Sequence, residues 1–210
     1  MTGNESLPGV LIVISAPSGA GKTSVLDEVF KRFDDISFSV SATTRKPRDG
    51  EIDGEDYYFV SNDDFDRYIE DDAFAEWAPV HGNRYGTLNK TINDSLERGG
   101  ILVLDTDTVG AFNIRKRFPE SVLVFIAPPS PEELRNRLFN RNTEPHEIIQ
   151  KRLDAAPGEI QCMHRYDYII INDELENAVG KLSSIIDAET AKTNRILPTL
   201  TAWKDNIDGA

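Results

Sequence analysis

The chain has little cysteine and no long apolar run, and each shortage excludes a class of protein. Its one cysteine, Cys162, cannot form a disulfide within the chain, and no cysteine cluster offers a structural zinc site. The longest early apolar run, Val10 to Ser15, is far shorter than the about 20 residues that span a bilayer. Met1 to Pro8 also lacks the basic and apolar segments of a targeting signal. We therefore expect a protein of the reducing cytoplasm, with no membrane partner.

Positive charge is scarce as well. The 210 residues include 23 Lys and Arg against 36 Asp and Glu, a formal net charge of -13 at pH 7. Such a charge repels nucleic acid, so we expect no nucleic-acid partner, and a phosphate ligand then needs a locally basic site. Charges are screened over roughly 8 Å at physiological salt, so a few converging arginines can dominate inside a cleft. The length suits one compact domain over residues 1–210, and it leaves a homo-oligomer open.

A glycine-rich segment, residues 16–23, follows the apolar run. A buried strand that ends in such a turn points backbone N–H groups and a helix N-terminus at one phosphate. Lys22 adds a cation, and Thr23 adds a hydroxyl for a magnesium ion on a nucleotide. A purely structural turn with a solvated lysine is the alternative, but strand, glycines, lysine, hydroxyl and helix occur in the required order. The expected phosphate contacts are Ala16, Pro17, Ser18, Gly19, Ala20, Gly21, Lys22 and Thr23.

The remaining pattern indicates an α/β fold. Strand-length apolar runs alternate with helix-period segments, as in a parallel sheet core flanked by helices, and residues 38–98 look like a small mixed α/β sub-domain. Strands are expected at Val10–Ser15, Ile36–Ser41, Tyr57–Val60, Phe74–Ala78, Ile101–Asp105, Val122–Ala127 and Tyr168–Ile171. Helices are expected at Lys22–Phe33, Phe65–Ile69, Leu88–Arg98, Pro131–Leu138 and Leu175–Ala188, with a turn-rich connection at His81–Thr87.

Residues 43–50 form a polar loop in which Arg45 and Arg48 flank Pro47. Proline keeps the segment extended, and two planar guanidinium groups can then clasp one phosphate with paired N–H bonds. For this segment alone, surface ion pairs with the acidic neighbours explain the arginines equally well.

A second basic set, Arg137, Arg141 and Arg152, flanks a polar hinge. These arginines suit a lid that closes over phosphates, although by themselves they would more often form a solvated helix face. Asp105 ends a buried strand at the edge where doubly wound sheets bind ligands, so it could hold magnesium through water. Capping of the next helix is the competing role for Asp105 and for Asp107.

These residues, together with Glu51, Gly54, Tyr57 and Phe59, resemble the guanylate kinase family, and the likeness runs from about Val10 to Asp187. The resemblance implies a P-loop nucleoside monophosphate kinase that transfers a phosphoryl group from MgATP to GMP, giving ADP and GDP. ATP is then the co-substrate and Mg²⁺ the metal. The implied division is a core of residues 8–37, 99–136 and 156–190, a GMP-binding sub-domain of 38–98, a lid of 137–155 and a C-terminal tail of 191–210.

The resemblance also implies a role for each matching residue. The implied GMP phosphate ligands are Ser41, Arg45, Arg48, Tyr57 and Tyr85, and the residues facing guanine are Glu76, Thr87 and Asp107. The implied ATP and metal groups are Lys22, with Thr23 and Asp105 for Mg²⁺ and Asn172 near the adenine, and the implied lid cations are Arg137, Arg141 and Arg152.

The role of Glu76 makes chemical sense. Guanine presents two adjacent donors, N1–H and N2–H₂, which one carboxylate can accept, whereas adenine would place an acceptor against that acid. Sites matched in this way can discriminate by about 10⁴. Without the resemblance, Glu76 could equally be a solvent-facing acid on an alternating strand.

Four positions depart from the family pattern. Ala16 replaces the first glycine of the phosphate motif, Val109 stands where a glutamine is usual, and Asn140 and Asn142 replace lid glycines. Asparagine tolerates left-handed backbone better than most residues, so we expect the lid to keep its geometry. Val109 lacks the side-chain amide of that glutamine, and we expect this loss to affect guanine affinity or the support of Asp107.

Two other functions remain as alternatives. One is a guanylate-kinase-like interaction module that has lost catalysis, but such modules typically lack the phosphate-site lysine, and Lys22 is present. The other is a kinase of phosphorylated sugars, for which Glu76, Tyr85 and Thr87 would have no reason to match a guanine pocket.

Overall fold

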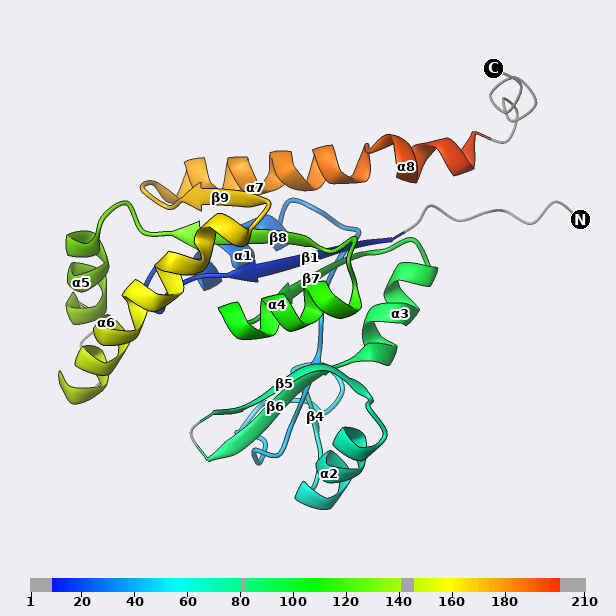
Figure 1. Ribbon diagram of the computed structural model, residues 1–210, viewed down its shortest axis with the longest axis horizontal. Coiled ribbons are helices and arrows are strands. Elements are labelled where there is room, and N and C mark those ends of the chain that lie inside the picture. Colours follow the sequence, from blue (N-terminus) through cyan, green and yellow to red (C-terminus); the bar gives the residue numbers. More distant parts are fainter. Residues whose placement is uncertain (1–8, 81, 141–145, 201–210) are drawn as a thin grey trace, which may run out of the picture.

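The computed structural model describes residues 9–80, 82–140 and 146–200. Two β-sheets organise these residues, a five-stranded parallel sheet in the order β2-β7-β1-β8-β9 and a four-stranded sheet in the order β4-β3-β6-β5 (Figure 1). The strands of the parallel sheet are β1 (Val10–Ser15), β2 (Ile36–Phe38), β7 (Ile101–Asp105), β8 (Val122–Ala127) and β9 (Tyr168–Ile171). Those of the four-stranded sheet are β3 (Ser41–Thr43), β4 (Tyr57–Phe59), β5 (Phe74–Val80) and β6 (Asn83–Leu88).

Helices cover both faces of the parallel sheet. In Figure 1, α7 lies above this sheet, α3 and α4 lie below it, and the four-stranded sheet lies lower still. The helices are α1 (Lys22–Phe30), α2 (Asn62–Glu70), α3 (Asn89–Glu97), α4 (Thr108–Arg117), α5 (Pro131–Asn140), α6 (His146–Gln161), α7 (Leu175–Thr190) and α8 (Thr193–Ile196). Two short 3₁₀ helices are η1 (Cys162–Arg165) and η2 (Leu197–Thr199).

Strand β1 belongs to two hydrophobic cores at once, because successive side chains of a strand point to opposite faces. Ile12 and Ile14 pack with residues of α1 and α7, whereas Leu11 and Val13 pack with residues of α3 and α4. All six residues of β1 are therefore buried. The continuous apolar run is the sequence signature of such a two-sided strand.

The four-stranded sheet has a smaller core of its own. Ala42, Phe65 and Phe74 are buried there, and Phe65 comes from α2, whose N-cap is Ser61. Two contacts attach this unit to the rest of the molecule. Ala75 of β5 is buried in the same cluster as α4, and Arg117 Nη1 of α4 donates to Asp72 Oδ2 over 2.8 Å.

The prediction for Ile36–Ser41 is wrong in one respect, because the run belongs to two sheets. Strand β2 ends at Phe38 and pairs with β7, while β3 begins at Ser41 and pairs with β4 and β6. The Ser39 backbone N–H still donates to Val103 O over 2.9 Å, so pairing with the parallel sheet ends there. The chain crosses between the sheets at residues 39–40.

The prediction of a turn-rich connection at residues 81–87 is wrong from residue 83 onwards; residue 81 lies outside the described residues. Residues 83–88 form β6, which pairs with β5 on one side and β3 on the other. Helix α3 begins at Asn89 after Leu88 as its N-cap, and α1 ends at Phe30, three residues before the expected Phe33.

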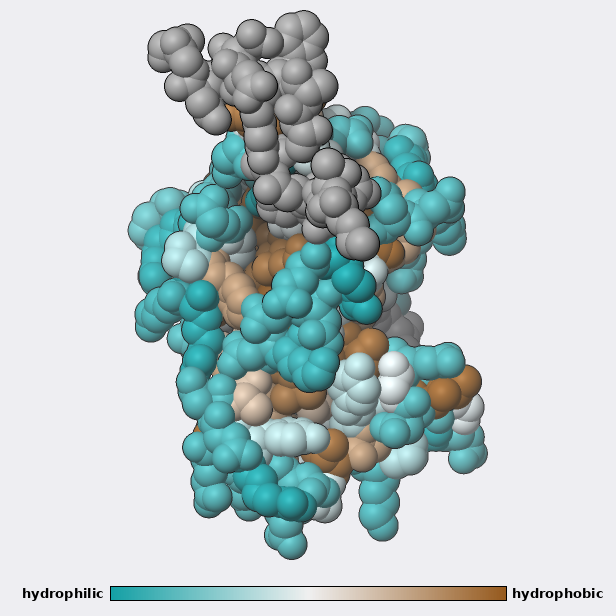
Figure 2. Space-filling view, turned by 90° about the vertical axis from the view of Figure 1, so that its right-hand side faces the viewer, coloured by the Kyte–Doolittle hydropathy of each residue, from teal (hydrophilic) through white to brown (hydrophobic). Residues whose placement is uncertain are grey.

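Charged residues make up 28% of the chain. Figure 2 shows one face on which hydrophobic side chains appear only in patches between hydrophilic ones. Within the described residues, no helix combines the length and the apolar character that a membrane crossing requires.

Candidate active site

The loop after β1 has the backbone of a phosphate-binding turn. Gly19 and Gly21 have φ angles of 93° and 89°, a left-handed region that glycine adopts without a steric cost. A methyl group on Gly21 would overlap the Asn172 side-chain amide, so the close approach also requires glycine. Helix α1 begins at Lys22, and its first N–H groups therefore face the loop. Ala16, the first departure from the family pattern, packs partly buried against the core and leaves this geometry intact.

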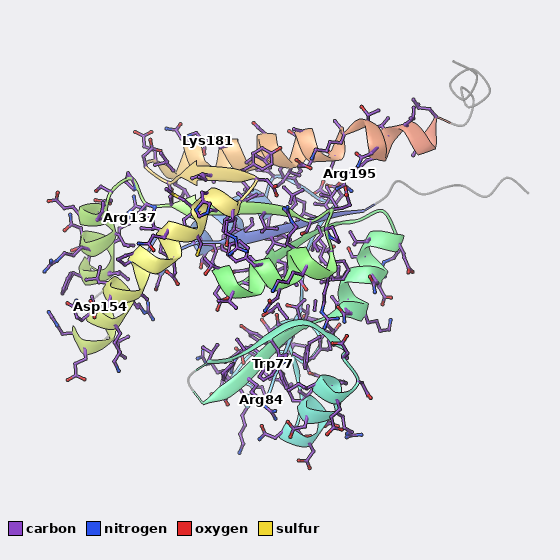
Figure 3. The ribbon with its side chains drawn as sticks, viewed as in Figure 1. Trp77, Arg84, Arg137, Asp154, Lys181 and Arg195 are labelled. Carbon is purple, nitrogen blue, oxygen red and sulfur yellow. The ribbon has the colours of Figure 1, made fainter. Side chains whose placement is uncertain are left out.

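Two side chains from the far edge of the sheet brace the loop. Asn172, which follows β9, donates from Nδ2 to Ala20 O over 2.7 Å. Arg137 of α5 donates to Asn172 O over 3.0 Å and to Ala20 O over 3.4 Å, and its Nε–H is bound by Glu133. Figure 3 labels Arg137 on α5, beside the carboxyl end of the parallel sheet.

A hollow of about 430 Å³ adjoins this brace. Its lining residues are Gly19, Gly21, Ser24, Arg137, Asn140, Asn172, Asp173 and Leu175. The predicted contact of Asn172 with adenine stays a prediction, and the structure adds a second role, because this amide holds the P-loop carbonyl.

Lys22 is bound by Asp105 in this structure. The Lys22 ammonium donates to Asp105 Oδ1, which β7 presents next to β1. Asp105 therefore does not cap the next helix; its partner is the P-loop lysine. Thr23, one residue on, is exposed at the start of α1.

The metal donors expected from the sequence are all oxygens. Among the residues that the structure describes, no three histidine, cysteine, aspartate or glutamate side chains converge on a point that would hold a metal ion. One hydroxyl and one carboxylate fit Mg²⁺, which takes few protein ligands and completes its shell with phosphate oxygens and water.

The lid arginines come from α5 and α6. Arg152 of α6 donates to Ser18 Oγ over 3.0 Å, so a cation from this helix already reaches the P-loop. Arg141 and Asn142 lie outside the described residues. Asn140 ends α5. Among the described residues Asp72 is the only non-glycine with a positive φ, so the backbone at Asn140 is not left-handed, although asparagine would tolerate that conformation.

A second hollow, of about 270 Å³, opens between the two sheets. Its lining residues are Phe38, Ser41, Asp56, Tyr57, Glu76, Ala78, Val80, Tyr85, Gly86, Asp105, Thr106 and Asp107. Asp105 lines this cleft and also binds Lys22, so the cleft and the P-loop form one continuous site.

A β-bulge in β5 positions Glu76. Phe74 pairs with Leu88 but Glu76 pairs with Thr87, which leaves Ala75 as an extra residue. Phe74 and Trp77 consequently share the face that packs on Phe65 of α2, and Glu76 faces the cleft.

The Glu76 carboxylate accepts a hydrogen bond at Oε1 from the Thr87 hydroxyl over 2.9 Å. Burial raises the pKa of the Glu76 carboxyl above its usual range; the Thr87 hydrogen bond opposes that shift, and the charge of Asp107 adds to it. Since the alternating-strand alternative places this acid in solvent, its half-buried position in the cleft argues against it.

Asp107 is the N-cap of α4. Its Oδ1 accepts from the Gly110 backbone N–H over 2.7 Å, so the capping role that competed with base recognition is present. Val109 is 66% exposed and does not support this carboxylate, since Gly110 does. The usual glutamine is therefore not needed to hold Asp107 in place.

Arg45 is held by Glu51 in a bidentate ion pair. Nη1 and Nη2 donate to the two oxygens of Glu51 over 2.9 and 2.8 Å, and Glu51 Oε2 also accepts from the Arg48 backbone N–H over 2.7 Å. The pair raises the pKa of Arg45 and lowers that of Glu51. The guanidinium also lies 5.3 Å from the ring centre of Tyr57. Arg45 thus pairs with an acidic neighbour, but the pair is mostly buried and is not the surface ion pair of the alternative.

Two tyrosines of the expected phosphate site lie together. The rings of Tyr57 and Tyr85 meet edge to face with centroids 5.9 Å apart, and both line the cleft with Ser41. Burial raises the pKa of Tyr57, which keeps its phenol a neutral donor. The Arg48 side chain, by contrast, is exposed at the loop.

Sequence reasoning named Glu51 only within the family motif, without a role, and did not name Thr106. Glu51 anchors Arg45, and Thr106 enters the cleft between two aspartates that were considered. The signal for Glu51 was available, because it lies six residues from Arg45 in one proline-stiffened loop. No local signal existed for Thr106.

The chain is similar over most of its length to known guanylate kinases. The guanylate kinase family model matches residues 9–189. Guanylate kinase of Geobacter sulfurreducens is 50% identical over 193 residues, which are 92% of this chain and 95% of that protein. Guanylate kinase of Thermotoga maritima is 41% identical over 203 residues, 97% of this chain and 98% of that protein. The crystal structure of guanylate kinase from Anaplasma phagocytophilum superposes with a TM-score of 0.72 at 35% identity, covering 94% of this chain and 95% of the other.

Proposed function

The chain belongs to the guanylate kinase family and phosphorylates GMP to GDP with ATP as the phosphoryl donor, and we propose that both nucleotides meet in the cleft between the P-loop and the four-stranded sheet. One observation carries this proposal. Asp105 lines the cleft next to the base-facing residues and also binds Lys22, so the cleft leads directly to the P-loop.

Glu76 is proposed to select guanine. Thr87 donates to one carboxylate oxygen, and this bond orients the group toward the cleft, where it can accept the N1–H and N2–H₂ donors of guanine. Adenine would leave the acid facing a ring nitrogen acceptor without a proton between them. Asp107 lies at the same end of the cleft as a second acceptor.

The GMP phosphate is proposed to bind where Ser41, Arg45, Tyr57 and Tyr85 converge, with Arg48 joining from the loop. Glu51 takes up two donor directions of the Arg45 guanidinium and fixes its plane, which leaves other N–H groups for a phosphate. A planar cation held in this way loses little further entropy when the phosphate binds.

At the other end, the P-loop from Ala16 to Thr23 is proposed to hold the ATP phosphates. Phosphoryl transfer needs positioning and charge stabilisation and no covalent enzyme intermediate, and Lys22 supplies a cation for the β- and γ-phosphates. When bound, Mg²⁺ would be held by Thr23 and, through water, by Asp105, and would neutralise phosphate charge. Lys22 must then exchange Asp105 for a phosphate oxygen.

The lid cations Arg137, Arg141 and Arg152 are proposed to neutralise the transferring group. The bond from Arg152 to Ser18 and the one from Arg137 to Ala20 O support this role for two of them, because they bring positive charge to the P-loop. Closure would also exclude water, which would otherwise hydrolyse ATP.

A panel of acceptors tests this proposal. We expect magnesium-dependent ADP formation from ATP with GMP, and little with AMP, UMP, ribose phosphates or no acceptor. The Glu76→Gln variant should lose about 10²-fold in kcat/KM for GMP, because the new amide N–H₂ faces guanine donors. The matched control is Glu70→Gln, at an exposed end of α2. Comparable turnover with AMP would refute the role of Glu76, and absent binding of ATP and GMP would favour an interaction module.

The remaining expectations on partners and place stay proposals. The net charge of -13 argues against nucleic acid and anionic membranes as partners, and the nucleotides are proposed to bind at the locally basic cleft. The single free cysteine, Cys162, supports a cytoplasmic location. The sequence leaves a homo-oligomer open, and sedimentation velocity would decide the oligomeric state.

A further inference from the structure

Glu76 lies against the first turn of α4 at the one place where that turn has no side chain. Gly110 is buried there, and a methyl group built on its Cα would lie 3.0 Å from Glu76 Oε2 and would overlap the Thr106 hydroxyl. A carbon and an oxygen at that distance repel, so one of the neighbours would have to move. The bare backbone at residue 110 therefore provides the space that the carboxylate occupies.

The carboxylate is confined from the opposite side as well. The Thr87 hydroxyl donates to Oε1 over 2.9 Å from β6. The strand that carries Glu76 is itself fixed, because the neighbouring Ala75 is buried in the cluster that contains α4. One carboxylate oxygen is thus held by a hydroxyl on β6, and the other lies next to the glycine of α4.

Helix α4 cannot easily retreat to make room. The Gly110 N–H is bound by Asp107 Oδ1 over 2.7 Å, and the next residue, Ala111, is fully buried beneath the parallel sheet with Ile114. A shift of this turn would break the N-cap and disturb the core.

We propose that Gly110 is a positioning residue for guanine selectivity: its missing side chain lets the Glu76 carboxylate lie against α4 in the orientation that accepts the guanine donors. The inference rests on the proposed role of Glu76. Gly110 itself need not touch either nucleotide.

The test is Gly110→Ala in the full chain, assayed with GMP and ATP varied separately. We expect the KM for GMP to rise about tenfold, the loss of roughly one hydrogen bond to a charged group, with kcat and the KM for ATP within about twofold. The preference for GMP over AMP in kcat/KM should fall by the same factor. Alanine favours helix over glycine, but the methyl also overlaps the Thr106 hydroxyl, so the melting temperature is compared in the Thr106→Ala background, where it should not fall.

The matched control is Gly180→Ala in α7, where a methyl group meets nothing within 4 Å. It makes the same chemical change in a helix and should leave both KM values unchanged. If Gly110→Ala raises the KM for ATP as much as that for GMP, or lowers the melting temperature even in the Thr106→Ala background, Gly110 is merely structural and the proposal is wrong.

A second pair of variants identifies which neighbour matters. The double variant Thr106→Ala/Gly110→Ala removes the hydroxyl overlap but keeps the methyl beside Glu76 Oε2, and it is compared with Thr106→Ala alone. We expect the rise in KM for GMP to persist. Its disappearance would assign the effect to Thr106 and overturn the proposal.

The role of Glu76 and the role of Gly110 can be tested separately. If Glu76→Gln raises the KM for GMP and Gly110→Ala does not, the positioning role of Gly110 is wrong while the proposed function stands. If Glu76→Gln has no effect on GMP or AMP kinetics, base recognition by Glu76 is wrong and the role of Gly110 falls with it.

Discussion

At the P-loop end of the cleft, backbone geometry arranges the binding groups, whereas at the base end paired side chains do so. The loop after β1 depends on two glycines with positive φ, on a helix N-terminus and on a strand buried over its whole length. The GMP end depends on Glu76 of β5 with Thr87 of β6, and on Arg45 with Glu51 in the loop between β3 and β4.

This difference suits the two tasks. Every nucleoside triphosphate offers the same phosphates, which a fixed array of N–H groups can bind without reading the base. Distinguishing one purine from another requires hydrogen-bonding groups matched to one edge, and those have to come from side chains. We therefore expect changes at the two ends to have different kinetic signatures.

The largest effect should follow loss of the P-loop cation. Lys22→Ala should lower kcat by about 10²- to 10³-fold, because a preorganised positive charge at the transferring phosphate is removed. Steady-state assays at saturating ATP and GMP measure this. The control is Lys31→Ala, whose ammonium forms an exposed pair with Glu28 just after the same helix. If kcat of Lys22→Ala stays within a few fold of that of the unsubstituted enzyme, the P-loop does not supply the catalytic charge and the proposed difference between the two ends is wrong.

A smaller effect is expected from the support of Arg45. Glu51→Gln should raise the KM for GMP about tenfold and leave the KM for ATP unchanged, because one charge-assisted bond to the guanidinium is weakened. Glu55→Gln, exposed in the same loop, is the matched control. Equal changes in both KM values would show that the loop supports the whole fold and not the GMP end alone.

The smallest effect concerns pH. Burial raises the pKa of Glu76, so the group takes up a proton at a higher pH than an ordinary glutamate. Protonation removes an acceptor, and the KM for GMP should rise as pH falls through this pKa, by at most about tenfold per unit. Because the GMP phosphate titrates near pH 6, the profile is compared with that of Glu76→Gln. If the two profiles coincide, Glu76 does not titrate in the binding step.

The parallel core could be predicted from sequence because its signals are local. The apolar run Val10–Ser15, the glycines and the helix that follows are contiguous, and the structure has strand, loop and helix in those places. The run at Ile36–Ser41 could not be divided in advance, since both parts are β-prone and only their partners in different sheets distinguish them.

Strand β6 and the bulge in β5 could not be predicted from the sequence, because they too depend on pairing with other strands. Residues 83–87 include asparagine, arginine and glycine, which are poor strand formers, and pairing with β5 and β3 overrides that preference. The extra residue Ala75 shows only when β5 is aligned with its neighbour. Likewise, the bonds from Lys22 to Asp105 and from Arg152 to Ser18 join positions 83 and 134 residues apart, which no short pattern connects.

The bulge in β5 separates two duties that a regular strand would have to combine. Ala75 packs the small sheet into the core beside α4, and the next residue projects into the cleft. An evolving or engineered enzyme could therefore exchange the residue at position 76, and with it the preferred nucleobase, without unfastening the sheet that carries it.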